Sequence, residues 1–211
     1  MKKILLATLA VIAITSISQA QFKIGIKAGG NLAEQRVTSS ANGSYYSNNH
    51  IKSYHAGVIA DMKIAENVYL QPQILYTRKG STLLSTTDAT SSRVRLNYID
   101  VPVNLLYKLP LSFGKIFAGT GATFSYGFSG KQQINGQQQK IYHDVKTWKH
   151  EDLALNFTAG LELNNGLFAS INSQKGLLDV YKTSNTSVKN KSLSVSVGYL
   201  TSLDTFKKHK K

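Results

Sequence analysis

The stretch from residue 152 to residue 172, DLALNFTAGLELNNGLFASIN, alternates apolar with small or polar side chains in a period of two. Successive side chains of a β-strand point to opposite faces, so the pattern predicts two strands, each with one apolar and one polar face. The NNG triplet at residues 164–166 separates the two strands, as expected for a tight hairpin turn. The class of protein then depends on what the apolar face contacts, a protein core or something else.

Segments with the same alternation recur along the chain, and helical spacing is hard to find. One segment is irregular, because Val94, Leu96 and Tyr98 are out of phase with the apolar positions that follow them. We expect a β-bulge near Ile99 to reconcile its two halves. The sequence therefore predicts an all-β fold of about eight strands. They are expected at residues 22–29, 54–64, 67–80, 93–108, 115–128, 152–163, 167–172 and 192–200.

The connections between these strands alternate between long and short. Every long connection would then lie at the same end of an up-and-down antiparallel meander. Outer-membrane barrels have this form, with short periplasmic turns and longer extracellular loops. Long connections are expected at residues 31–52, 80–92, 129–150 and 175–190, and short ones at residues 65–67, 109–114 and 164–166.

The amino terminus has the features of a secretory signal peptide. Two lysines precede an apolar run, and small residues at Ser18 and Ala20 favour cleavage before Gln21. We therefore expect a signal peptide at residues 1–20, a barrel domain at residues 21–203 and a basic tail at residues 204–211, with export to the cell outer membrane. The chain has no cysteine, which excludes a lipoprotein anchor, disulfides and thiolate metal sites.

The composition of the polar faces indicates which way they point. They combine many glycines with charges of both signs, which suits a narrow lumen better than a solvated exterior. The apolar faces would then contact lipid, where the first and last strands must pair to close the barrel. A barrel of about eight strands is filled by its own side chains, so a closed polar plug is favoured over an ion path. The expected luminal polar network consists of Lys27, Asp61, Lys63, Lys108 and Glu162.

The chain is strongly basic, with 25 lysines and arginines against 11 aspartates and glutamates. This balance favours anionic partners. An exported protein seldom meets nucleic acid, so the expected partners are outer-membrane lipid and lipopolysaccharide. Cations near the outer ends of the strands would contact lipopolysaccharide phosphates. They are Arg78, Lys79, Arg93, Arg95, Lys131, Lys140, Lys146 and Lys149.

The chain resembles the PorT-like outer-membrane β-barrel domain family of the Bacteroidota. The segments that carry the likeness are FKIGIKAGGNLA, YLQPQILYTRKG, LNYIDVPVNLLYKL, FAGTGATFSYGF and LSVSVGY. The resemblance implies a small barrel linked to secretion of other proteins across the envelope. We therefore expect a porin-like barrel with a structural, adhesion or secretion-associated scaffolding role in the cell envelope, with other envelope or secretion proteins as partners. Two departures are Gln73, where the family tends to carry an acidic residue, and the FKKHKK ending in place of a terminal aromatic residue.

The densest set of titratable residues runs from His143 to Asp152. A histidine base with a serine nucleophile would make a lipid-modifying outer-membrane enzyme, and His143 with His150 would suit a metal. Neither reading matches a known motif spacing, so we expect no catalysis, no cofactor and no metal. A secreted, soluble lipocalin-like barrel that binds an apolar ligand is a further alternative, because it has the same alternation with the faces reversed.

Overall fold

The computed structural model describes residues 22–39, 47–84, 91–134, 137–142, 148–180 and 186–202. The expected signal peptide (residues 1–20) and basic tail (residues 204–211) lie outside these residues. Within the described ranges, no helix is long and apolar enough to span a membrane. The strands are β1 (Phe22–Ser39), β2 (Ser47–Asn49), β3 (Ile51–Ala65), β4 (Val68–Leu84), β5 (Ser91–Leu111), β6 (Gly114–Ile134), β7 (Gln137–Ile141), β8 (Glu151–Leu163), β9 (Leu167–Gly176) and β10 (Thr186–Ser202).

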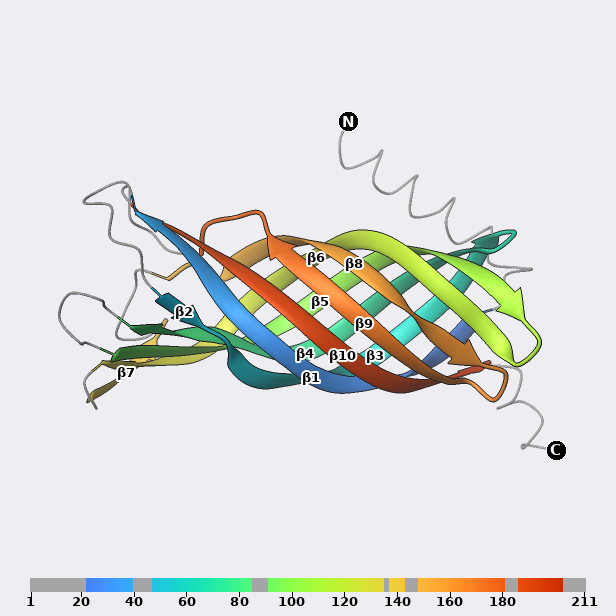
Figure 1. Ribbon diagram of the computed structural model, residues 1–211, viewed down its shortest axis with the longest axis horizontal. Coiled ribbons are helices and arrows are strands. Elements are labelled where there is room, and N and C mark those ends of the chain that lie inside the picture. The colour runs from blue at the N-terminus through green and yellow to red at the C-terminus, as the bar shows by residue number, and fades with distance from the viewer. Residues whose placement is uncertain are drawn as a thin grey trace.

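Eight of the described strands form a closed antiparallel ring in the order β1–β3–β4–β5–β6–β8–β9–β10 (Figure 1). Pairing of β1 with β10, from Lys23 opposite Ser202 to Ser39 opposite Thr186, closes the barrel. The short strands β2 and β7 pair with β4 and β6 at the left end in Figure 1, opposite the tight turns. The predicted up-and-down barrel of about eight strands is confirmed.

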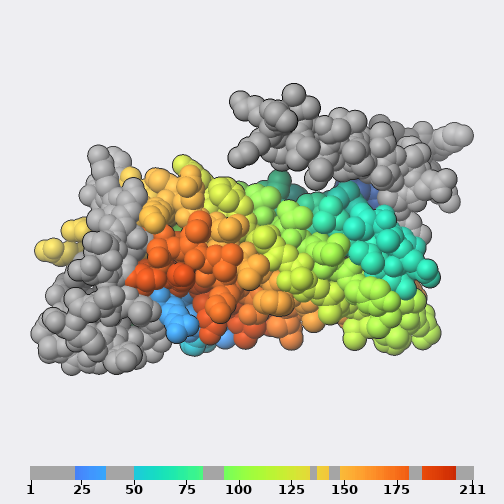
Figure 2. Space-filling model, turned by 90° about the horizontal axis from the view of Figure 1, so that it is seen from above, coloured from blue at the N-terminus to red at the C-terminus, as the bar shows by residue number. Residues whose placement is uncertain are grey.

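The apolar faces of the strands form the outer wall. On β10, Val195 and Val197 are 59% and 62% exposed, whereas Ser196 between them is 1% exposed. Figure 2 shows part of this wall, where β8, β9 and β10 appear in orange to red. The prediction that polar faces point inward is confirmed. The soluble lipocalin-like alternative is wrong, because such a barrel would bury the apolar faces.

The strands extend beyond their expected limits at the end opposite the tight turns. Residues 31–39, expected in a long connection, continue β1 against β10, and β7 lies within the expected connection at residues 129–150. These segments are rich in Ser, Asn and Gln and lack apolar alternation. Backbone groups nevertheless pair there, because each peptide carries a donor and an acceptor whatever its side chain.

The expected bulge near Ile99 of β5 is instead on β6. Asn97 pairs with Ser129 and Tyr98 with Gly127, which leaves Phe128 as the extra residue. β5 keeps a single alternation, so Leu96 and Tyr98 point into the lumen in phase with Asp100. The apparent phase change arose because the upper lumen is apolar while the lower lumen is polar.

Gly121 of β6 faces the lumen where β6 lies close to β5. A Cβ at this position would lie 2.7 Å from the Cα of Asn104 and would collide with the carbonyl oxygen of Val103. We expect Gly121→Val to lower the free energy of unfolding by roughly 1–3 kcal/mol through overpacking, measured by urea unfolding in phospholipid vesicles. The matched control is Ala122→Val on the outer wall, which we expect to change stability by less than about 0.5 kcal/mol. Equal losses in both variants would contradict the crowding of β6 against β5.

Candidate functional site: a closed lumen and a cationic outer groove

A cluster of four charged side chains occupies the lumen near the tight-turn end. Lys108 Nζ lies 2.7 Å from Asp61 Oδ2 and 2.7 Å from Glu162 Oε2. Lys23 Nζ donates to Glu162 Oε1, also at 2.7 Å. Lys108, Asp61 and Glu162 are each at most 2% exposed. We call Lys23, Asp61, Lys108 and Glu162 the basal cluster; its two cations and two carboxylates balance, which such burial requires.

A chain of amides connects the basal cluster to the middle of the barrel. Gln71 donates to Asp61 Oδ1 at 3.2 Å, and Gln73 donates to Gln71 at 3.1 Å. Lys27 Nζ donates to the side-chain oxygen of Gln73 at 3.3 Å. Lys27 therefore contacts amides and no carboxylate of the basal cluster. Lys63 is half-buried beside the turn after β3 and makes none of these contacts.

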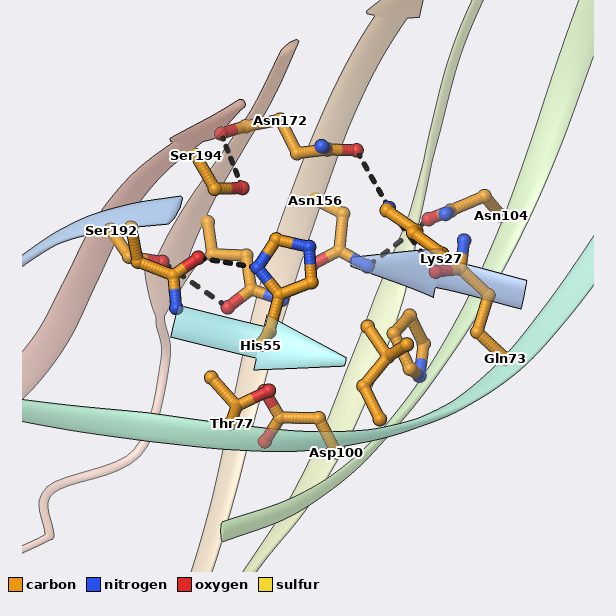
Figure 3. A pocket seen from close by; sticks show the side chains of 14 residues that line it. Lys27, His55, Gln73, Thr77, Asp100, Asn104, Asn156, Asn172, Ser192 and Ser194 are labelled. Carbon is orange, nitrogen blue, oxygen red and sulfur yellow. Dashed lines mark hydrogen bonds between the residues drawn. The ribbon is translucent and has the colours of Figure 1, made fainter. Parts of the chain in front are cut away.

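The middle of the lumen is filled mostly by uncharged polar side chains around His55, with Lys27 and Asp100 at the edge of the same cavity. Its Nδ1 lies 2.6 Å from Asn31 Oδ1 and its Nε2 lies 3.0 Å from Ser196 Oγ. Figure 3 shows Lys27, His55 and Asn156 reaching the same cavity from different strands. The cavity measures about 30 Å³. This volume is enough for one or two water molecules and too small for a larger solute.

The upper lumen holds a second ion pair, and it includes one of the cations expected outside. Lys79 is 3% exposed; its Nζ lies 3.1 Å from Asp100 Oδ1 and donates to Ser125 Oγ at 3.0 Å. The expected contact of Lys79 with lipopolysaccharide is therefore wrong, because alternation along β4 turns Lys79 inward with Thr77 and Ser81. Asp152 also points inward and accepts a hydrogen bond from Asn190 at 2.7 Å.

An apolar plug closes the lumen above this second ion pair, and the sequence analysis missed it. Within it, Leu96, Tyr98 and Val180 are fully buried. Tyr142 packs against the plug, and burial raises the pKa of its hydroxyl. The signal that could have revealed the plug is the unbroken alternation from Asp100 back to Val94. The plug consists of Val94, Leu96, Tyr98, Ile141, Trp148, Val180 and Val188.

The titratable residues from His143 to Asp152 do not form one site among the residues described. His150 stacks on Tyr142 with ring centroids 4.2 Å apart, Glu151 is exposed, and Asp152 lies inside the lumen. His143 lies outside the described residues. No group of three or more His, Cys, Asp or Glu side chains suited to a metal ion occurs in the described part of the chain.

A cationic groove lies on the outer wall across the upper parts of β4, β5, β6 and β7. It has a volume of about 580 Å³, and Phe128 and Tyr142 contribute aromatic surface to it. The structure thus brings together five of the eight cations expected to contact lipopolysaccharide. Lys149 is exposed and does not line the groove, and Lys146 lies outside the described residues. The five are Arg78, Arg93, Arg95, Lys131 and Lys140.

Comparison with known proteins places this architecture among outer-membrane barrels. Residues 17–182 match a family model described as "Outer membrane protein beta-barrel domain". Solved structures similar to the chain include the attachment invasion locus protein Ail of Yersinia pestis (14% identity, 86% of this chain and 99% of that chain, TM-score 0.44). Another is Neisserial surface protein A (13% identity, 86% and 99%, TM-score 0.46). No curated protein sequence matches the chain.

Proposed function

Because the chain belongs to the outer membrane protein β-barrel domain family, matched over residues 17–182, we propose that it is a closed structural barrel that carries a platform for other envelope components. Residues 1–20 would be removed on export, and the tight turns would face the periplasm. Other envelope components would bind at the end of the barrel that carries β2 and β7. A barrel of this form suits a scaffold for adhesion or for a secretion machine, and the PorT-like resemblance favours the link to secretion.

The observation that carries this proposal is the closure of the lumen. The basal cluster, the amides around His55, the Lys79–Asp100 pair and the apolar plug follow one another along the barrel axis. Each layer joins side chains from different strands, so the interior is cross-linked, and the cavities between the described residues are small, about 30 Å³ at His55 and about 10 Å³ beside Asp152. A barrel filled in this way is rigid and serves as a support, whereas a transporter needs a continuous path.

The platform is built from paired strands above the bulge at Phe128. There β5 pairs with β6 up to Ser92 opposite Ile134, and β7 pairs with β6 from Gly130 opposite Ile141. Ladder hydrogen bonds therefore hold this sheet to the barrel. Exposed side chains of β7, including Gln138 and Gln139, are available to a partner.

Planar-bilayer recordings test the proposed closure. We expect the refolded barrel to produce no unitary current steps, because the plug and the polar layers fill the interior. An open porin in the same bilayers is the positive control, and heat-modifiable mobility on a detergent gel confirms that the sample is folded. Reproducible steps from folded protein would overturn the closed-barrel proposal.

A lipid-modifying enzyme remains a separate proposal to test, and we do not favour it. His150 Nδ1 donates to the backbone oxygen of Gly127 at 2.6 Å and does not contact a nucleophile there, and Asp152 lies beneath the plug. Lipopolysaccharide acyl chains from a deletion strain and its parent should have the same composition. A difference that the wild-type gene restores would favour the enzyme.

A further inference from the structure

The groove on β4–β7 concentrates cations that repel one another. Arg95 on β5 pairs directly with Lys131 on β6, and Lys131 pairs directly with Lys140 on β7. Residues opposite each other on neighbouring antiparallel strands share a face, so three positive charges form a row across the outer wall. Like charges in this position destabilise a sheet. Binding of an anion would relieve the repulsion within such a row.

Among the described residues that line the groove, no carboxylate lies beside Arg95 or Lys131. Among the described residues, Arg93, Arg95 and Lys131 have no ion pair with aspartate or glutamate. Elsewhere on the same end of the barrel the pattern is different, since Lys191 pairs with Glu34 at 2.7 Å. Arg93, Arg95 and Lys131 thus lack an ion pair within the part of the chain that the structure describes, on a surface whose other cations include paired ones.

Arg78 is held in position at the lower edge of the groove. Its Nε donates to Asn97 Oδ1 at 3.3 Å, and its guanidinium lies 5.3 Å from the ring centroid of Tyr54. Tyr76 donates its hydroxyl to the same Asn97 oxygen at 2.9 Å. A guanidinium fixed in this way offers its remaining N–H groups as a preformed fork, the geometry that suits phosphate oxygens.

The groove begins where the exposed aromatic side chains end. The ring of Tyr76 lies between those of Tyr54 and Phe128, with centroids 6.0 and 6.1 Å away, and Phe128 also lines the groove. Aromatic girdles mark the boundary between acyl chains and headgroups in outer-membrane barrels. The five cations therefore lie at headgroup height, directly above an apolar wall that includes Ile99 and Val101.

We infer that this groove is a binding site for a phosphorylated glycolipid of the outer leaflet, of the lipopolysaccharide class. Phosphate oxygens accept hydrogen bonds from Arg95, Lys131 and Arg78, and the acyl chains lie along the wall below Phe128. The ligand must carry both negative charges and acyl chains, because the groove is cationic above Phe128 and apolar below it. The inference rests on the membrane orientation in the proposed function and adds a specific ligand to it.

The test compares lipid A binding to the refolded barrel and to two charge-matched double variants. Arg95→Gln with Lys131→Gln removes two cations from the groove. Lys52→Gln with Lys175→Gln removes two exposed, outward-facing cations at the same end of the barrel but outside the groove. Binding of bisphosphorylated lipid A in detergent is measured by calorimetry, and folding of every variant is checked by heat-modifiable mobility.

We expect the groove variant to bind lipid A at least about tenfold more weakly, since two charge-assisted contacts are lost, while the control variant binds as the wild type does. Dephosphorylated lipid A should bind the wild type at least about tenfold more weakly as well. Unchanged affinity in the groove variant, or equal losses in both variants, would overturn the site. A soluble sulfated polysaccharide that binds the groove as tightly as lipid A would overturn the choice of a lipid. The planar-bilayer recordings test the closed-barrel proposal separately from this lipid site.

Discussion

Lys108→Met should lower the free energy of unfolding by about 3–5 kcal/mol, the largest loss expected from one substitution in this barrel. The Lys108 ammonium lies between Asp61 and Glu162, 2.7 Å from each. Without it, two carboxylates remain inside the lumen with one cation, Lys23, on Glu162. Urea unfolding in phospholipid vesicles measures the loss, followed by heat-modifiable mobility on a gel.

Two further variants separate loss of charge pairing from loss of packing. Lys63→Met removes a half-buried lysine near the same end of β3 that makes no contact with the basal cluster, and we expect a change below about 0.5 kcal/mol. Lys108→Met combined with Asp61→Asn and Glu162→Gln should recover at least half of the lost stability, because no unpaired carboxylate remains. No recovery in the triple variant would show that unpaired carboxylates are not the cause.

Leu96→Ala should destabilise the barrel by about 2–5 kcal/mol, because it leaves a cavity in the apolar plug. Leu96 is fully buried among Val94, Tyr98 and Trp148 in the same cluster. Trp148 is the single tryptophan of the chain, so its fluorescence reports on the plug directly. We expect its emission to shift to longer wavelength as water reaches the indole.

The matched control for the plug is Leu105→Ala on the same strand. Leu105 is 49% exposed on the outer wall, where acyl chains fill the space that a shortened side chain leaves. We expect a loss below about 1 kcal/mol and unchanged Trp148 emission, since Leu105 is not part of the plug. If Leu105→Ala were the more damaging substitution, the inside and the outside of β5 would be wrongly assigned.

Sequence periodicity correctly predicted which way side chains point wherever the alternation was followed along a strand without interruption. It placed Lys27, Asp61, Lys108 and Glu162 inside the barrel. It failed at Lys79, because Lys79 was grouped with Arg78 as an outward cation at the top of its strand and the inward parity of Thr77 was not continued. A different assumption hid the plug, because the expected bulge near Ile99 turned Val94 and Leu96 to the same face as the apolar residues that follow them.

The contacts inside the lumen could not be predicted, because they depend on the stagger of the strands around the ring. Lys23 and Glu162 lie 139 positions apart in sequence and meet across the lumen. Whether Glu162 faces Lys23, Lys27 or Lys63 depends on the tilt of the strands, which alternation does not specify. The cationic groove could not be predicted for the same reason, because the pairing register of the strands places Lys131 between Arg95 and Lys140.

The sequence by itself determined the all-β class, the approximate number of strands, the end of the barrel that carries each connection, and the face that meets lipid. These properties follow from the period-two geometry of a single strand, which each segment expresses locally. Only the tertiary structure decided the partners of each luminal charge, the apolar plug and the cationic row on the outer wall. Those features require side chains from several strands to lie at the same height along the barrel axis. Only the pairing of all strands in the closed ring fixes these relative heights.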